Sequence, residues 1–196
     1  ANCHRRPGAD NFGSGGRIFE LSAVQGVWQD ITMEVCDVNA AQRSECPHEI
    51  LVSVRTMTLV TYGCGASFCK ELFVPIKNRR HTKPEGGLWA SPIGCSYGWK
   101  EWCEAESWGD LTESFETVYE GRTLVIDSLR DLSGFVWQED RYGFGYPDYE
   151  TMLRLGVDGI YLTDRGELET RFSTPGLYGY DCECVLVMNQ KCIRAR

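Results

Sequence analysis

The sequence predicts an all-β fold, namely a single antiparallel β-barrel or β-sandwich that is stapled by disulfides and carries one long Trp-rich loop. Three observations predict it. Apolar and polar residues alternate over several short segments, turn signals separate these segments, and 10 of the 196 residues are cysteine. The alternation of strand and helix patterns that marks an α/β fold is missing.

The N-terminal third of the chain combines a polar arm with the first strand candidates. Residues 1–16 are polar and rich in Gly, so we expect an arm tethered through Cys3, followed by a single β domain over residues 17–196. Residues 49–62 alternate strongly and predict a strand with Val52 and Val54 on one face. Residues 70–76 predict a shorter strand, which Pro75 places at an edge or an end.

Residues 77–112 are predicted to form a long ordered loop insertion. They hold Gly, Pro, four tryptophans and two cysteines, and no alternation is sustained. Cys95 and Cys103 would pin this loop, which has room for a short helix over residues 100–108. A loop of this length in a compact domain usually covers something or has a function.

Alternation returns in the last third of the chain. Asp158-Gly159 and Arg165-Gly166 are spaced as hairpin turns. We expect strands at residues 114–121, 122–129, 134–143, 151–159, 160–166, 167–174 and 182–188. The side chains predicted to point into a barrel are those of Val52, Val54, Leu124, Ile126, Phe135, Trp137, Leu153 and Leu155.

One local motif resembles a known family. Phe19, then Gly26, Trp28 and Ile31, fit the spacing of the first lipocalin signature. Similarity to this lipocalin or calycin family implies an eight-stranded antiparallel barrel. In it Gly26 lets the chain turn into the first strand and Trp28 closes the narrow end of the barrel. The alternative is a buried Trp on the first strand of another β fold.

The cysteines predict disulfides and an oxidising compartment. Their number is even, and the three histidines are isolated, so disulfides explain them better than zinc does. Cys182 and Cys184 leave a strand on opposite faces and should reach different partners. The connectivity stays open. The predicted disulfide residues are Cys3, Cys36, Cys46, Cys64, Cys69, Cys95, Cys103, Cys182, Cys184 and Cys192.

Charge and composition exclude several partners. The net charge of −8 argues against nucleic acid, and the chain has no apolar run long enough for a membrane span. Because the chain begins at Ala1 and is rich in cysteine, we expect a secreted, extracellular protein whose signal peptide has been removed. No cofactor or metal is expected, and the sequence does not set the oligomeric state.

Aromatic residues mixed with Gly and Pro supply the candidate binding surface. Such residues suit a ligand pocket or a protein contact, although Trp99 and Trp102 could instead pack beneath their loop. A further aromatic group occurs at residues 177–180. The candidate ligand- or partner-binding residues are Trp89, Trp99, Trp102, Trp137, Tyr142, Phe144, Tyr146 and Tyr149.

Three functions compete at this point. The motif at Phe19 favours a secreted carrier that holds a small hydrophobic ligand, such as a lipid or pigment, inside a barrel. The first alternative is an extracellular receptor-binding or adhesion module that acts on a protein or glycan through its aromatic loops. The second is a carbohydrate-binding or carbohydrate-active domain. No nucleophile motif is present, so we lean against an enzyme, and only carboxylates beside aromatics, such as Glu139, would support one.

Overall fold

The computed structural model describes residues 50–79, 83–139, 141–143 and 145–196. Several predictions fall outside these residues. They concern the arm at residues 1–16, the lipocalin-like segment with Gly26 and Trp28, Phe144, and the cysteines at positions 3, 36 and 46.

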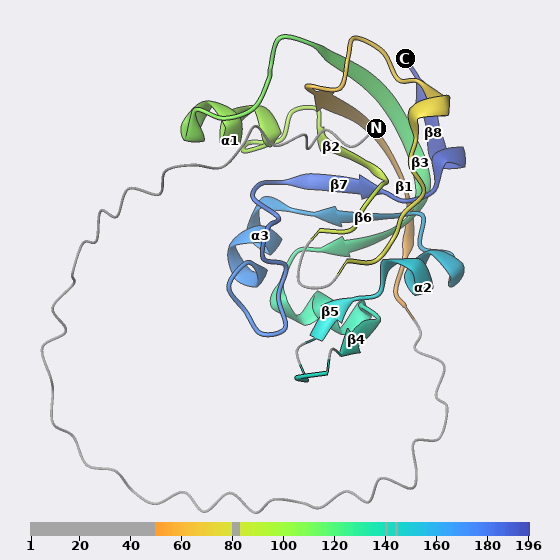
Figure 1. The fold of residues 1–196 in the computed structure, drawn as a ribbon, viewed down its shortest axis with the longest axis vertical. Helices are drawn as coiled ribbons and strands as arrows, with labels where there is room; N and C mark the ends of the chain where they lie inside the picture. The colour runs from red at the N-terminus through yellow and green to blue at the C-terminus, as the bar shows by residue number, and fades with distance from the viewer. Residues whose placement is uncertain (1–49, 80–82, 140, 144) are drawn as a thin grey trace, which may run out of the picture. The chain divides into compact units, whose positions relative to one another are not determined.

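Five strands close into a β-barrel in the spatial order β1-β2-β7-β6-β3, and β3 pairs back with β1 (Figure 1). An additional short strand, β8, extends β3 on its other edge. The strands of this sheet are β1 (Ser53–Tyr62), β2 (Leu88–Pro92), β3 (Ser114–Ile126), β6 (Gly159–Leu162), β7 (Cys184–Val187) and β8 (Ile193–Ala195). The prediction of a mostly β chain is therefore confirmed, and of the two predicted architectures, barrel and sandwich, the structure has the barrel.

The sequence predicts a wholly antiparallel barrel, and this prediction is wrong for one pair of strands. Strand β3 runs parallel to β6, with Leu124 opposite Ile160, while the other barrel pairs are antiparallel. Parallel neighbours need a crossover. Here the chain between them forms a 3₁₀ turn, η2 (Leu129–Gly134), the small sheet of β4 (Trp137–Glu139) and β5 (Gly145–Pro147), and helix α2 (Tyr149–Arg154).

Side chains of alternate strand residues fill the inside of the barrel. Along β3, every second residue from Phe115 to Thr123 is buried. Tyr119 and Leu59 of β1 have no exposed surface. The residues of this inner core are Leu59, Leu88, Ala90, Phe115, Tyr119, Val185, Val187 and Ile193.

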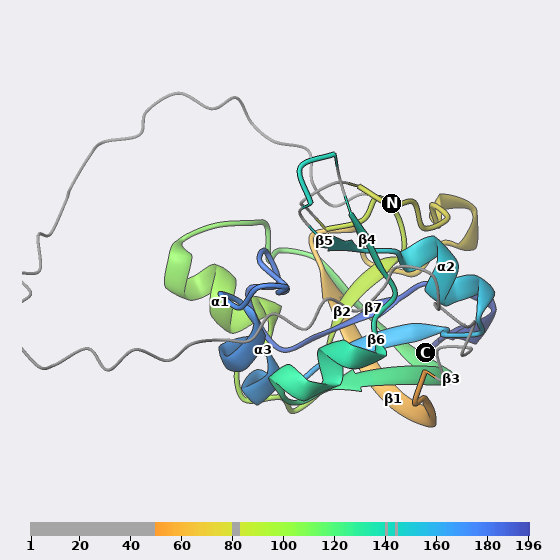
Figure 2. The same ribbon diagram turned by 90° about the horizontal axis from the view of Figure 1, so that it is seen from below.

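A second core lies against the outside of the barrel. Leu124, Ile126 and Ile160 point out of it and pack with Tyr149 and Met152 of α2. Seen from below, the small sheet and α2 lie on one side of the barrel strands (Figure 2). Leu124 and Ile126, predicted to point into the barrel, instead belong to this outer core.

Two other inward predictions are wrong: Val54 lies on the expected strand but on its outward face, opposite to Leu59, and Leu155 follows a helix rather than lying on a strand. Val54 is 69% exposed and Leu155 is 51% exposed. Residues 151–154 belong to α2 rather than to a strand, so their side chains follow a helical period.

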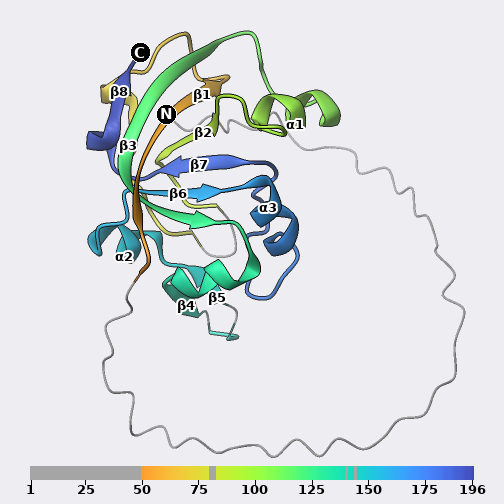
Figure 3. The ribbon, with the colours of Figure 1, turned by 180° about the vertical axis from the view of Figure 1, so that it is seen from behind.

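Two further segments predicted as strands are helical. Residues 164–170 form helix α3 (Asp164–Thr170), which begins where the Thr163 hydroxyl accepts a hydrogen bond from the Gly166 amide (3.0 Å). Residues 70–72 form a 3₁₀ turn, η1 (Lys70–Leu72). In contrast, residues 114–126 are one continuous strand, β3, which curves along its length (Figure 3).

Residues 77–112 are not a single loop, because they supply both a barrel strand, β2, and helix α1 (Trp99–Glu106). The helix confirms the short helix expected in this region. Helices α1 and α3 lie toward the same end of β6 and β7, away from α2 (Figures 1 and 3).

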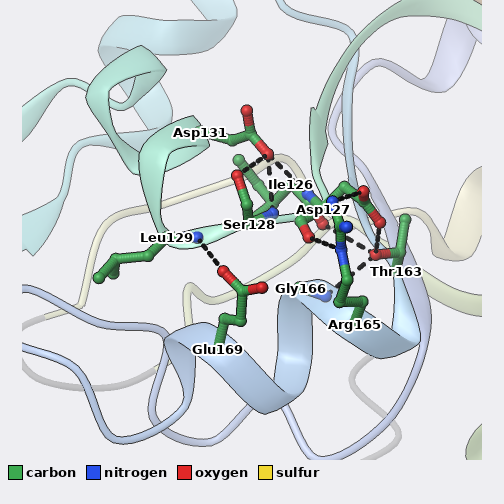
Figure 4. A network of polar contacts seen from close by, with 9 residues as sticks. All are labelled: Ile126, Asp127, Ser128, Leu129, Asp131, Thr163, Arg165, Gly166 and Glu169. Atoms are coloured by element: carbon green, nitrogen blue, oxygen red, sulfur yellow. Dashed lines mark hydrogen bonds and ion pairs between the residues drawn. The ribbon is translucent and has the colours of Figure 1, made fainter.

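A polar network ties α3 to the end of β3 (Figure 4). Asp127 accepts a hydrogen bond from the Thr163 hydroxyl (2.7 Å) and pairs with Arg165. Asp131 accepts from the backbone amides of Asp127 (2.9 Å) and Ser128 (2.8 Å). Asp127 and Asp131 therefore connect the end of β3 to η2 and to the start of α3.

None of the described helices has the length and apolar character that a bilayer crossing demands.

Candidate functional site

Helix α1 presents its tryptophans because both of its ends are fixed. At its start, the Ser91 hydroxyl of β2 accepts a hydrogen bond from the Trp99 amide (2.8 Å). The Glu101 carboxylate accepts one from the Gly98 amide (2.9 Å), which satisfies another donor of the first turn. At its end, Ser107 adopts a left-handed conformation (φ 51°) that reverses the chain.

This reversal packs three tryptophan rings together. Trp99 and Trp102 stack with centroids 4.9 Å apart, and Trp108 meets them edge-on at 5.5 and 5.7 Å. Trp99 and Trp102 are half-buried against the outer core, whereas Trp108 is 47% exposed. The three rings therefore form a rigid apolar cluster that is partly open to solvent.

Next to this cluster, and sharing Trp99 with it, three rings surround the ammonium group of Lys83. Its Nζ lies 4.8 Å from the ring centroid of Trp89 and 5.8 Å from those of Trp99 and Tyr180. The Asp181 carboxylate is 3.5 Å away. We call Trp89, Trp99, Tyr180 and Asp181 the ammonium cage, since aromatic faces and a carboxylate both attract a cation.

The cage is built on the core rather than on mobile side chains. Tyr180 is buried, shares a hydrogen bond with the Tyr149 hydroxyl (2.9 Å) and meets Trp89 edge-on at 5.0 Å. Burial raises the pKa of Tyr180 well above its usual value, so its ring stays neutral. Asp181 is held by Arg171, whose Nη2 is 2.9 Å from Oδ1.

Two further exposed rings neighbour cage residues in the chain, since Phe172 follows Arg171, which holds Asp181, and Tyr178 precedes Tyr180 by two residues. Tyr178 is 71% exposed and Phe172, with its centroid 6.3 Å away, is 80% exposed. Tyr97, just before α1, is placed near Asp181 by its backbone carbonyl, which accepts a hydrogen bond from the Glu183 amide (3.0 Å). We call this set the aromatic face; it comprises Tyr97, Trp99, Trp102, Trp108, Phe172 and Tyr178.

The structure divides the predicted binding residues between three places. Trp89, Trp99 and Trp102 come together at the cage and the aromatic face. Trp137 and Tyr146 belong to the small β4–β5 sheet, where the Trp137 indole donates to the Leu132 carbonyl (3.2 Å) and the Tyr146 hydroxyl to Gln138 (2.7 Å).

The remaining two predicted tyrosines differ in burial. Tyr142 is 68% exposed beside Arg141, on the turn between β4 and β5, and Tyr149 lies in the outer core. Neither lies on the aromatic face.

Sequence reasoning missed Lys83, Asp181 and Phe172. The aromatic group at residues 177–180 was visible, but nothing in the sequence placed it beside Trp89 and Trp99. Lys83 has no local signal either, because it faces rings that come from three different parts of the chain.

The cysteines near this site are present as protonated thiols. Six cysteines of the described residues are thiols, namely Cys69, Cys95, Cys103, Cys182, Cys184 and Cys192. Burial raises the pKa of Cys95 to about 11 and that of Cys184 to about 12, so both stay protonated at neutral pH. Within the described part of the chain, no cluster of His, Cys, Asp and Glu is suited to hold a metal ion.

Comparisons with family models, with curated proteins and with solved structures find no match to this chain.

Proposed function

We propose that this chain is a recognition module that binds an extracellular protein or glycan through its aromatic face. One observation carries the proposal: three tryptophans are locked together by packing and by α1, yet the outermost ring is left open to solvent. Large rings that are already fixed lose little entropy on binding, and Trp and Tyr dominate the binding energy of many interfaces.

The carrier function has less support from the described residues. Leu59, Tyr119, Val185 and Val187 point into the barrel, have no exposed surface and pack on one another. A carrier would need that volume for its ligand. The aromatic face, in contrast, offers apolar surface on the outside of the barrel.

The test measures binding to cell surfaces and to a glycan array by the protein and two variants. We expect Trp108→Ala and Tyr178→Ala each to weaken binding by about tenfold or more, the loss typical of an interface anchor. Tyr142→Ala is the matched control, because it removes a similarly exposed tyrosine from a different part of the molecule.

Two results would contradict the proposal. One is unchanged binding by both variants while their circular dichroism and unfolding midpoint match those of the parent. The other is equal loss from all three variants, which would place the contact elsewhere. Displacement of a fluorescent fatty acid from the barrel, with no surface binding, would instead support the carrier.

We further propose that the protein works outside the cell and that cysteines present as thiols in the structure become oxidised there. The support is the cysteine content of the sequence, which is high for a reducing compartment. Thiol titration in denaturant without reductant tests this. We expect few reactive thiols in protein isolated from an oxidising compartment, and ten reactive thiols per chain would contradict it.

A further inference from the structure

The ammonium cage holds its own lysine in surroundings that suit a different kind of cation. A primary ammonium carries three N–H donors, each of which needs an acceptor. Among the described residues, Lys83 Nζ has the Asp181 carboxylate at 3.5 Å as its one charged partner, beyond the usual length of a charge-assisted hydrogen bond. The faces of Trp89, Trp99 and Tyr180 also lie around this nitrogen.

A quaternary ammonium would fit these surroundings better than a lysine does. It has no N–H group, so it loses no hydrogen bond when rings replace water around it, and its charge still interacts with the ring faces. The carboxylate of Asp181 balances the charge from a distance and is itself held by Arg171. The side chain of Lys83 is 22% exposed, so water has access to it.

We propose that the ammonium cage is a binding site for a quaternary ammonium compound and that Lys83 is its internal competitor. This proposal rests on the recognition function, since it names the chemistry that one part of the face accepts. The ligand enters as the Lys83 ammonium leaves for water, where it recovers its hydrogen bonds. The ligand binds only molecules whose cage is empty. Its apparent Kd is therefore the intrinsic Kd divided by the fraction of molecules in which Lys83 has left the cage.

The test uses tetramethylammonium chloride as the probe, followed by tryptophan fluorescence and by calorimetry on the full chain. Lys83→Gln removes the competing charge, and we expect it to tighten binding by about tenfold relative to the parent. Lys100→Gln is the matched control, because Lys100 is exposed on α1 and pairs with Glu104 rather than with the rings. It should bind as the parent does.

A second pair of ligands separates charge from shape. Choline and its uncharged carbon isostere 3,3-dimethylbutan-1-ol have nearly the same size. We expect choline to bind Lys83→Gln and the isostere to bind at least tenfold more weakly, because only choline carries a charge for the rings and Asp181. Trp89→Leu in the Lys83→Gln background should reduce the difference, because it removes the ring nearest to the cation.

Three results would overturn the proposal. They are a folded Lys83→Gln variant that shows no saturable binding of tetramethylammonium, equal affinities for Lys83→Gln and Lys100→Gln, and equal affinities for choline and its isostere. Unfolding midpoints of each variant establish that the fold is kept.

Failure here is distinguishable from failure of the recognition function. If the cage binds no cation but Trp108→Ala still loses its surface partner, the recognition function stands and the cage proposal falls. If tetramethylammonium binds but Trp108→Ala and Tyr178→Ala bind surfaces normally, the reverse holds.

Discussion

Tyr119 fills the centre of the barrel and dictates the residues around it. Its hydroxyl shares a hydrogen bond with Thr123 (2.9 Å). A Cβ on Gly121 or Gly159 would lie within 2.8 Å of that hydroxyl, so glycine at both positions makes room for it. Burial raises the pKa of Tyr119, which keeps the interior uncharged.

Thr117 is a residue of the barrel interior whose buried hydroxyl is expected to lower the stability of the fold. Its hydroxyl is buried and has no hydrogen-bond partner among the described residues. Thr117→Val replaces it with a methyl group of similar volume, so we expect a gain of about 1 kcal/mol in the free energy of unfolding. Urea denaturation measures it. A loss of stability would mean that the hydroxyl has a partner such as a buried water.

Asp148 gives the fold a predictable response to acid. Burial opposes its charge, but hydrogen bonds from Thr151, Asn78 and Gln138 outweigh burial and lower its pKa below 3.8. A carboxyl group whose pKa is lower in the folded state stabilises the fold at pH values above its pKa in the unfolded state. This stabilisation is lost as the pH falls through the pKa of the folded state. Asp148→Asn should therefore cost about 2 kcal/mol at pH 7.

The same variant should differ less from the parent below pH 3.8, the ordinary Asp value, where the parent carboxylate begins to take up a proton. Urea unfolding at pH 7 and at pH 3 checks both points. Glu104→Gln is the control, because Glu104 is exposed on α1 and its carboxylate lies 3.9 Å from the ammonium group of Lys100. A constant difference between Asp148→Asn and the parent at all pH values would contradict the assignment.

At the residue scale, only part of the site was open to prediction. The sequence predicts a short helix over residues 100–108, and because α1 begins one residue earlier, Trp99 and Trp102 lie three residues apart on one side of it. The partners of Lys83 come from β2, α1 and the segment before β7, and only the completed barrel brings those segments together.

Helix α3 shows how a correct local signal can be overlooked. Residues 167–174 alternate in hydrophobicity and so suggest a strand, and Arg165-Gly166 suggests a turn. Thr163 followed by Asp164 and Glu167 is equally a helix start, with acidic residues in the first turn. The structure follows the second pattern because α3 packs on the end of β3.

Gly166 is required by that packing. A Cβ at this position would lie 2.1 Å from the carbonyl oxygen of Ile126, a backbone atom that cannot move aside. We expect Gly166→Ala to lower the free energy of unfolding by about 1–3 kcal/mol despite the higher helix propensity of Ala. Gly145→Ala is the control, because its Cβ would make an ordinary contact of 3.7 Å with Trp137. Equal stabilities of the two variants would contradict the close packing of α3.

Strand β3 was predicted as two strands because Glu120-Gly121 has the composition of a turn. In the structure Gly121 lies in the middle of the strand. The reason is tertiary, since the Tyr119 hydroxyl occupies the space that a side chain would take. No local pattern carries that information.

For the molecule as a whole, the sequence predicts a barrel or a sandwich but not the connections between the strands. Alternating segments report that strands exist and that one face is buried. The parallel pairing of β3 with β6 and the position of β2 between β1 and β7 depend on contacts between distant residues. Hydrophobic periodicity is blind to such contacts.

The barrel has one weak seam. Strands β1 and β2 share two register pairs, Leu59 with Pro92 and Val60 with Ser91, whereas β1 and β3 share ten. Pro92 has no N–H to donate across this seam. We expect amide hydrogen exchange to be faster in β2 than in the centre of β3, because local opening begins where pairing is thinnest. Equal protection of both strands, measured by NMR, would contradict this.

The place of β2 has a consequence for refolding. Strand β2 shares more register pairs with β7, three, than with β1, two, and β7 lies more than ninety residues further along the chain. Until β7 arrives, β2 presents an unpaired apolar edge that a second molecule can join. The yield of refolded monomer should therefore fall steeply as protein concentration rises, and dilution rather than time should be the remedy.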